Sequence, residues 1–280
     1  MSKRIFRDLI QARWLLNTHI CIGLDTEWEK LPRSMRKRTI LGSISPFNRR
    51  IIDTTHDLVC AYKINMAFYE QYGVDGIKAL MHTIGYIRSE APEIPVILDA
   101  KRGDIDNSSA AYAKSAFNVY GADAVTVNPL LGRDSIQPFL DYENKGIFVL
   151  CHTSNPDSNK FQDIPADGVP LYQTIARHVT NEWNTNNNCG LVVGATFPDQ
   201  LFHVRHIAKD MPILIPGIGK QEGDLQQTIY AGVNSQKSGI IINASRSVIF
   251  ASQDDDFDKA ARNETLRLRD AVSGYISTIR

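Results

Sequence analysis

Residues 95–105 read PVILDAKRGDI, and this stretch joins a strand-like run to a dense group of charges. The apolar residues PVIL are followed by Asp99, Lys101, Arg102 and Asp104 within six positions. A surface loop carries such charges without penalty, whereas a buried strand carries them only if they are paired. The stretch therefore indicates either an ordinary loop or a buried strand that ends in a functional cluster of charges.

Eight apolar runs of this kind recur along the chain. Most are continuous rather than alternating, which is typical of parallel strands covered by helices. The runs are HICIGLD (19–25), LVCAYKINM (58–66), PVILD (95–99), AVTVNP (124–129), GIFVLCHTS (146–154), GLVVGAT (190–196), PILIP (212–216) and GIIINA (239–244). They predict eight strands.

The segments between these runs have helical character. Clear helices are predicted at 107–120, 199–210 and 257–276, and a short helix before the first strand. Eight strand–helix units without a break in composition predict a single-domain (β/α)8 TIM barrel of the α/β class over residues 1–280. An open doubly wound sheet is the alternative, but no GxGxxG motif follows the first strand. Residues 153–170 are irregular and too long for a simple turn, so we expect an enlarged lid or binding loop.

The composition excludes several classes of function. The 280 residues include 31 basic and 31 acidic side chains, so the chain has no net charge. This balance argues against a general role on nucleic acid or a membrane surface, because both need a basic footprint. Cys21, Cys60, Cys151 and Cys189 lie in apolar runs without CxxC spacing. They predict buried thiols in a reducing compartment, here the cytoplasm.

Polar side chains gather at the predicted strand ends, where a barrel places its active site. Because side chains alternate along a strand, Asp99 and Lys101 share a face, and Lys63 shares one with Asn65. If both faces point inward, Lys63, Asp99 and Lys101 converge in one pocket, while Asp104 projects out of its own barrel. A structural salt-bridge cluster is the alternative, but four such charges together favour a reaction site. The strand-end set is Asp25, Lys63, Asn65, Asp99, Lys101, Asp104, Asn128, Thr153, Ser154, Thr196, Gln221, Ser245 and Arg246.

Two further stretches follow the seventh and eighth predicted strands: PGIGKQEG (216–223) and NASRS (243–247). Glycine-rich backbone and a helix N-terminus supply amide donors, and Arg246 supplies a planar, charged fork. Loops after strands seven and eight hold phosphate in many barrels. Together the two stretches predict a phosphate site.

The remaining motifs are weaker candidates. The seven histidines form no HExxH pattern, and His203 and His206 fit a solvated helix face. The acidic run at 254–256 fits a charge cluster at a helix N-terminus rather than a metal site. We therefore expect no metal site.

With these motifs in view, the sequence resembles the orotidine 5′-phosphate decarboxylase family. The shared pattern is GLD (23–25), YKIN (62–65), DAKRGDI (99–105), PGIG with Gln221, and SRS (245–247). It runs in order across nearly the whole chain, from about Asp25 to Ile249. LDAKRGDI together with CHTSNP (151–156) is similar to the longer bacterial branch, which has an enlarged loop after strand five.

The resemblance implies a reaction and its centre. The reaction is cofactor-free decarboxylation of orotidine 5′-monophosphate to uridine 5′-monophosphate and carbon dioxide, the last step of de novo pyrimidine biosynthesis. Lys101 would protonate C6 of the pyrimidine, Asp99 would face the substrate carboxylate, and Lys63 would hold Asp99 and the ribose.

The resemblance also implies a homodimer in which Asp104, Ile105 and Ser108 reach into the partner subunit's site. Asp104 is thereby counted among the catalytic residues. The other substrate-binding residues implied are Asp25 for the ribose, Ser154 for the base, and Gln221, Ser245 and Arg246 at the phosphate end.

Two other interpretations stay open. Related barrels with a D-x-K-x-x-D motif are metal-dependent sugar-phosphate decarboxylases or aldolases. They typically place a glutamate on strand two, where this chain has Lys63, a cation that would repel magnesium. A non-catalytic barrel that binds a phosphate ligand is the other, but such a barrel has no reason to keep buried charges.

Overall fold

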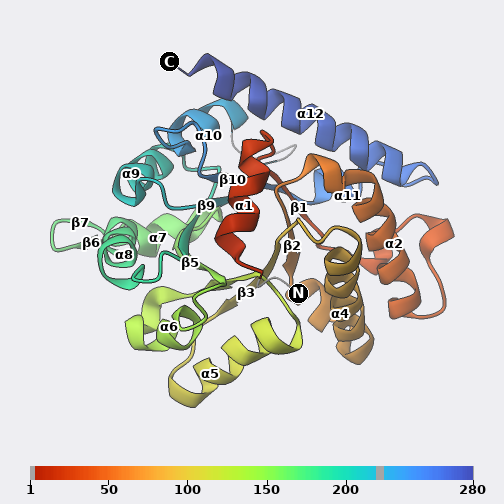
Figure 1. The fold of residues 1–280 in the computed structure, drawn as a ribbon, viewed down its shortest axis with the longest axis horizontal. Helices are drawn as coiled ribbons and strands as arrows, with labels where there is room; N and C mark the ends of the chain where they lie inside the picture. Colours follow the sequence, from red (N-terminus) through yellow and green to blue (C-terminus); the bar gives the residue numbers. More distant parts are fainter. Residues whose placement is uncertain (1–3, 219–223, 280) are drawn as a thin grey trace.

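The strands close into a barrel (Figure 1). The computed structural model describes residues 4–218 and 224–279, and within them eight parallel strands pair in the order β1-β10-β9-β8-β5-β4-β3-β2. Because β1 pairs with both β10 and β2, the barrel prediction is confirmed and the open sheet is wrong. The strands are β1 (Ile20–Gly23), β2 (Ala61–Asn65), β3 (Val96–Arg102), β4 (Ala124–Val127), β5 (Gly146–His152), β8 (Cys189–Val193), β9 (Ile213–Pro216) and β10 (Ile240–Ala244).

Helices surround the barrel as an outer ring (Figure 1). All three helices predicted above are present: 107–120 forms α5 and a π-helical turn, 199–210 forms α9, and 257–276 forms α12. The helices are α1 (Phe6–Leu15), α2 (Ile40–Thr55), α3 (Ala67–Glu70), α4 (Gly73–Glu90), α5 (Asp106–Lys114), α6 (Arg133–Leu140), α7 (Asn159–Gln162), α8 (Leu171–His178), α9 (Pro198–Ala208), α10 (Leu225–Gly232), α11 (Arg246–Ile249) and α12 (Phe257–Thr278). The 3-10 turns are η1 (Trp28–Lys30), η2 (Arg33–Met35), η3 (His56–Leu58), η5 (Pro129–Leu131) and η6 (Pro156–Ser158), and the π-helical turns are η4 (Ser115–Val119) and η7 (Val179–Trp183).

The apolar runs form strands because both of their faces are covered. Every residue of β1, β4, β8 and β10 is buried. One hydrophobic cluster lies between the sheet and the helices, and a smaller one fills the inside of the barrel. Burial on both sides explains why these strands read as continuous apolar runs.

The predicted helix before the first strand closes one end of the barrel. Figure 1 shows α1 lying across the centre of the ring of strands. Phe6 and Ile10 pack into the inner cluster, and the Phe6 ring meets the Phe148 ring edge-on at 5.6 Å. The indole N–H of Trp14 donates to the carbonyl of Ile240 at 2.9 Å. With the N-terminal end plugged by apolar side chains, the carboxyl ends of the strands are the end open to polar chemistry.

The buried residue His19, next to this plug, leads to a prediction about how the unfolding free energy depends on pH. Its side chain is buried, and burial lowers the pKa of the imidazole from 6.5 to about 4. Below pH 6.5 the unfolded chain therefore binds a proton that the folded chain excludes. The contribution of the neutral His19 side chain to stability is fully present above pH 6.5 and is lost as the pH falls towards 4. We expect the wild type to lose about 2 kcal/mol more unfolding free energy than His19→Gln between pH 7 and pH 5. Urea unfolding at both pH values measures this, and equal losses would contradict it.

The segment after β5 is more ordered than its sequence indicates. It contains η6, α7 and a small antiparallel hairpin of β6 (Pro165–Ala166) and β7 (Val169–Pro170). The Nε2 atom of His152 lies 3.1 Å from an Asp163 carboxylate oxygen, and the backbone N–H of Thr153 donates to the Gln162 side chain at 2.8 Å. These polar contacts fold residues 153–170 back onto β5, and the expectation of an enlarged lid or binding loop there stays a prediction.

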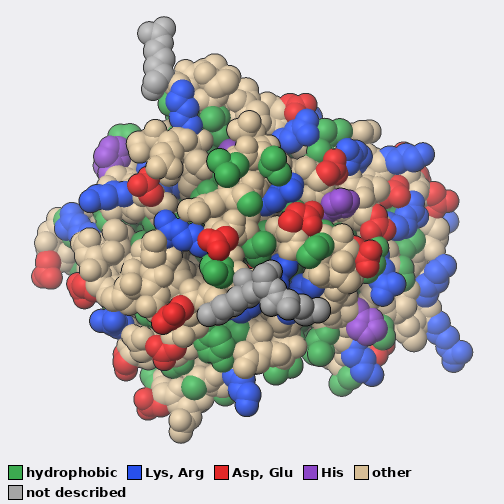
Figure 2. Space-filling view, viewed as in Figure 1, with side chains coloured by type: hydrophobic (Ala, Val, Ile, Leu, Met, Phe, Trp, Pro, Cys, Tyr) green, Lys and Arg blue, Asp and Glu red, His purple; other side chains and the backbone are tan. Residues whose placement is uncertain are grey.

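The structure also shows how the charged side chains and the four cysteines are placed. Acidic and basic side chains are interspersed over the face seen in Figure 2. All four cysteines are free and buried, as predicted, and burial raises the pKa of the Cys60 thiol well above its ordinary value. In the described part of the chain, no helix is both long enough and apolar enough to cross a membrane.

Candidate active site

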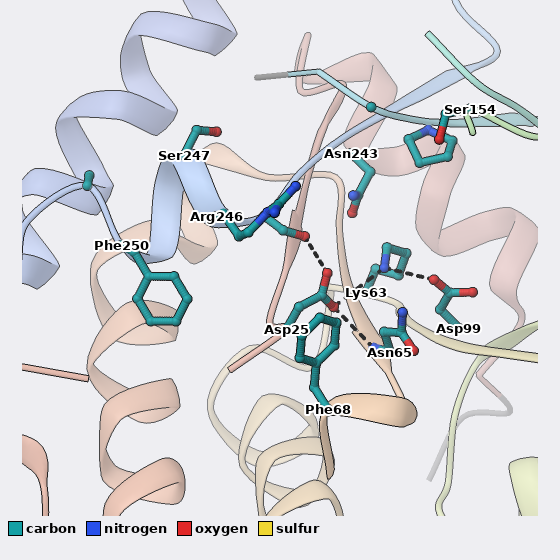
Figure 3. Close-up of a pocket in the computed structure, with 14 residues that line it drawn as sticks. Asp25, Lys63, Asn65, Phe68, Asp99, Ser154, Asn243, Arg246, Ser247 and Phe250 are labelled. Carbon is teal, nitrogen blue, oxygen red and sulfur yellow. Dashed lines mark hydrogen bonds and ion pairs between the residues drawn. The ribbon is translucent and has the colours of Figure 1, made fainter. Parts of the chain in front are cut away.

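A cavity of about 660 Å³ opens at the carboxyl ends of the strands (Figure 3). Its wall draws on β1, β2, β3, β5, β9 and β10 or on the residues that follow them, so the chain brings distant polar residues to one place. The lining residues are Asp25, Lys63, Asn65, Phe68, Asp99, Ser154, Pro216, Gly217, Asn243, Ser245, Arg246, Ser247, Phe250 and Ala251.

An alternating row of charges adjoins this cavity: Asp25, Lys63 and Asp99 line it, and Lys101, which is not among the lining residues, contacts Asp99. The Nζ atom of Lys63 is 3.0 Å from one oxygen of Asp99, and the Nζ atom of Lys101 is 2.7 Å from the other. Lys63 also lies 3.6 Å from an oxygen of Asp25. Lys63 is 3% exposed and Asp99 is 8% exposed. The structure therefore brings Lys63, Asp99 and Lys101 together.

The electrostatics keep this row charged. Burial alone would lower the pKa of Lys63, but Asp25 and Asp99 outweigh it and hold the pKa above the ordinary value. Burial alone would raise the pKa of Asp99, but Lys63 and Lys101 together hold it well below the ordinary value. Each charge is thus held by its neighbours, and the site presents a fixed carboxylate between two ammonium groups.

Strand β3 runs further than the sequence indicates. The predicted strand ends at Asp99, but β3 continues to Arg102, which pairs with Val127 of β4 after a register shift. Lys101 has a φ of +48°, in the left-handed region that side chains other than glycine rarely adopt. The side chain of Arg102 points elsewhere and binds Glu70 at 2.8 Å. Only part of the charge in DAKRGDI therefore belongs to the site.

A second group joins the ends of β1 and β10. The Ser245 hydroxyl donates to Asp25 at 2.7 Å, and the backbone N–H of Asn65 donates to the other Asp25 oxygen at 3.3 Å. Gly23 makes this approach possible, because a Cβ built there would lie 1.7 Å from the Ser245 hydroxyl oxygen. Gly194 does the same for Ser154, where a Cβ would lie 2.6 Å from the Ser154 Cα. The cavity walls depend on these two close contacts.

The structure describes some, but not all, of the residues of the predicted phosphate site. Arg246 begins the short helix α11, and both Arg246 and Ser247 line the cavity. Gly217 also lines it and has a φ of +103°. Gln221, the other residue expected there, lies outside the described residues.

The residues expected to reach a partner lie elsewhere. Asp104 and Ile105 directly precede α5 and Ser108 lies in its first turn, and none of them is among the residues that line the described cavity. Ile105 is 52% exposed, and the Asp104 carboxylate accepts a hydrogen bond from the Ile105 backbone N–H at 2.8 Å. That Asp104 projects out of its own barrel stays a prediction.

Comparison with known proteins identifies the family of this chain. A sequence profile described as the Orotidine 5′-phosphate decarboxylase / HUMPS family matches residues 18–261. The chain belongs to this family. It is 46% identical over 269 residues to the orotidine 5′-phosphate decarboxylase of Cellvibrio japonicus, a match that covers 96% of this chain and 98% of the relative. It is 47% identical over 272 residues to that of Cupriavidus necator, with the same two coverages.

Solved structures of the orotidine 5′-phosphate decarboxylase family share the fold. The Leishmania donovani OMP decarboxylase superposes with a TM-score of 0.85 at 37% identity, covering 98% of this chain and 100% of that one. The Leishmania donovani UMP synthase gives a TM-score of 0.88 at 37% identity over 99% of this chain. This chain spans 57% of the length of that synthase.

Of two polar residues of this decarboxylase barrel, Thr126 escaped the sequence analysis and Asn243 entered it only as the first residue of the stretch NASRS, without a role of its own. Asn243 is 6% exposed and lines the cavity, and its Oδ1 atom has no hydrogen-bond partner among the described residues. Thr126 is buried on β4 and bonds Asp99. The available signal was a polar residue inside an apolar run, at INA and VTV, but such residues also occur at structural positions. Their placement beside the charged row is visible only in three dimensions.

Proposed function

We propose that Lys63, Asp99 and Lys101 form the centre at which this chain decarboxylates orotidine 5′-monophosphate to uridine 5′-monophosphate in pyrimidine biosynthesis. Family membership and 46% identity over nearly the full length of a named decarboxylase support the overall reaction. We assign the centre to these residues because the carboxylate of Asp99 lies between the ammonium groups of Lys63 and Lys101. The cavity of about 660 Å³ is of a size that suits a small-molecule ligand.

The chemistry follows from these charges. When the bond from C6 to the carboxylate breaks, its electron pair stays on C6 and carbon dioxide leaves. A fixed ammonium at Lys101 favours this localised negative charge more than the spread charge of the substrate carboxylate, so it lowers the barrier. The same Nζ then gives its proton to C6. The Lys101 side chain is 47% exposed, so water can return the proton.

The other residues of the row have separate roles in this proposal. Lys63 is buried and its pKa is raised, so it keeps its proton and holds Asp99 and Asp25 in place. Asp99 faces the substrate carboxylate and orients Lys101. Asp25 and Ser245, joined by a hydrogen bond, bind the ribose hydroxyls.

In this proposal the phosphate and the base of the nucleotide bind at the far end of the cavity. Arg246 and the adjacent backbone bind the phosphate, because a guanidinium forms two parallel hydrogen bonds with phosphate oxygens. Ser154, which lines the cavity after β5, contacts the base. Gln221 is assigned to the phosphate end on the sequence alone.

We also propose that the enzyme is a homodimer with shared sites. Asp104, Ile105 and Ser108 lie outside the cavity of their own chain, and the exposed Ile105 supports a neighbour covering this surface. In such a dimer Asp104 enters the partner subunit's site and joins the charged row there. Residues 1–280 form one domain in this proposal, and the four buried free thiols support a reducing cytoplasm.

Mixing two inactive variants tests the shared site. Lys101→Ala and Asp104→Ala should each be inactive alone, but each mixed dimer should regain activity in one of its two sites, so about half of all sites in the doubly purified sample should be active. The recovered site takes Lys101 from one subunit and Asp104 from the other. Decarboxylation is measured after co-expression of differently tagged variants and purification through both tags. If Asp104 acts within its own chain, every mixed site lacks one residue and no activity returns.

The function itself is tested by an assay with excess EDTA and no added cofactor. Decarboxylation of orotidine 5′-monophosphate is followed by ultraviolet absorbance for the wild type. Turnover that survives EDTA supports the proposal. Turnover that needs magnesium favours the sugar-phosphate class, and binding of the nucleotide without turnover favours the non-catalytic barrel. The 3.0 Å contact between Lys63 and Asp99 argues against magnesium there, because the ammonium would repel it.

A further inference from the structure

The register between β3 and β4 singles out one threonine. Leu98 pairs with Val125 and Arg102 pairs with Val127, so residues 99–101 of β3 lie opposite Thr126 alone. This is a bulge, in which extra residues of one strand leave the ladder and lose their usual backbone partners. The two residues assigned to the reaction, Asp99 and Lys101, are both inside it.

The hydroxyl of Thr126 makes two contacts in this bulge. The backbone N–H of Lys101 donates to Oγ1 at 2.9 Å, and the Oγ1 hydroxyl donates to an Asp99 oxygen at 2.9 Å. That Asp99 oxygen is the one that also receives Lys101 Nζ, at 2.7 Å. Thr126 is 1% exposed. One buried hydroxyl thus links the backbone of Lys101 to the carboxylate that its side chain binds.

The backbone of Lys101 needs this support. Its φ of +48° is unfavourable for a residue with a side chain, and such a conformation persists only where the surroundings hold it. The Thr126 hydroxyl replaces the carbonyl that a regular ladder would offer to the Lys101 N–H. Without it, both the N–H and one Asp99 contact lose a partner, and the bulge can relax.

We propose that Thr126 is a positioning residue that holds Asp99 and Lys101 in the geometry needed for decarboxylation. It acts through these two residues and is not among those that line the cavity. The inference rests on the function proposed above for Asp99 and Lys101. It assigns part of the reaction geometry to a neutral side chain on a neighbouring strand.

Thr126→Val, which keeps the shape and removes the hydroxyl, is the main test. We expect kcat to fall by about 10- to 100-fold, because small misplacements of reacting groups and lost bonds to charged groups have effects of this size. KM should stay within about threefold, because the residues assigned to substrate binding are unchanged. Thr126→Ser restores the hydroxyl and should recover kcat to within about threefold of the wild type.

A buried threonine far from the site gives the matched control. Thr265 lies in α12, and its hydroxyl donates to the Ala261 carbonyl at 2.7 Å. Thr265→Val should change the melting temperature and leave kcat within about twofold of the wild type. Should Thr126→Val fail to fold, Thr126→Ala removes the hydroxyl without adding bulk and carries the same expectation.

The outcomes separate this inference from the function on which it rests. A wild type that does not decarboxylate orotidine 5′-monophosphate overturns both. An active wild type with unchanged kcat in Thr126→Val overturns the positioning role alone. So does a Thr126→Ser variant as impaired as Thr126→Val, because the hydroxyl would then not be the group that matters.

Discussion

Lys101→Ala is expected to abolish decarboxylation, with kcat reduced by about 10⁴-fold or more. The variant loses the cation that favours negative charge at C6 and the acid that supplies the proton. These two losses multiply because they act on the same transition state. The fold should survive, since the Lys101 side chain is 47% exposed and Asp99 keeps its contact with Lys63 at 3.0 Å.

The Lys101→Ala result needs a matched lysine elsewhere. Lys114 is an exposed residue near the end of α5, and Lys114→Ala should keep wild-type kcat. Ultraviolet absorbance at saturating substrate measures both variants, and thermal unfolding shows whether each is folded. A folded Lys101→Ala protein with wild-type kcat would remove Lys101 from the mechanism and leave the charged row without its assigned proton donor.

Lys63→Met is expected to lose stability as well as activity. Removing the buried cation leaves Asp99 with Lys101 as its one remaining cation and takes away the ammonium that lies 3.6 Å from Asp25, which lowers the unfolding free energy at pH 7 by about 3–5 kcal/mol. Because Asp99 also loses its anchor, we expect kcat to fall by about 10³-fold. Lys30, whose exposed side chain binds Glu27 at 2.7 Å, is the control. Lys30→Met should change the unfolding free energy by less than about 1 kcal/mol.

The pH dependence of the Lys63→Met loss has a defined sign. In the wild type the pKa of Lys63 is raised, so its contribution is fully present below its unfolded pKa and is lost only as the pH rises through the higher folded value. The depressed pKa of Asp99 gives a contribution that is present above its unfolded value and lost in acid. In Lys63→Met one of the two cations that hold the pKa of Asp99 down is gone, so Asp99 can take up a proton more readily and the deficit should shrink as the pH falls towards 5. Urea unfolding at several pH values measures it, and a deficit that is independent of pH would contradict the charged row.

Much of the site was accessible from the sequence because the barrel has a strict periodicity. Apolar runs separated by helical segments predict parallel strands, and parallel strands bring their carboxyl ends to one mouth. The recognition of these strands as neighbours therefore favours a meeting of Lys63 and Asp99, although the register pairs Asp99 with Asn65 and Lys63 with Ile97. The same reasoning places Asp104 beyond its strand end, outside the cavity of its own chain.

Other features depend on contacts that local pattern does not encode. The bulge in β3 and the positive φ of Lys101 arise from the pairing with β4 and from the Thr126 hydroxyl. The order in the segment after β5 arises from His152 and Asp163, eleven positions apart in the chain. Both are matters of which side chain meets which backbone group across the fold.

The periodicity of apolar residues and the motifs held at strand ends are enough to predict the barrel, the mouth that carries the chemistry and the family resemblance. The arrangement of the charges depends on contacts across the fold. Lys63 is held between Asp25 and Asp99, and Asp99 between Lys63 and Lys101. The physical reason is that burial makes a charge depend on neighbours within a few ångströms, and those neighbours come from strands far apart in the chain.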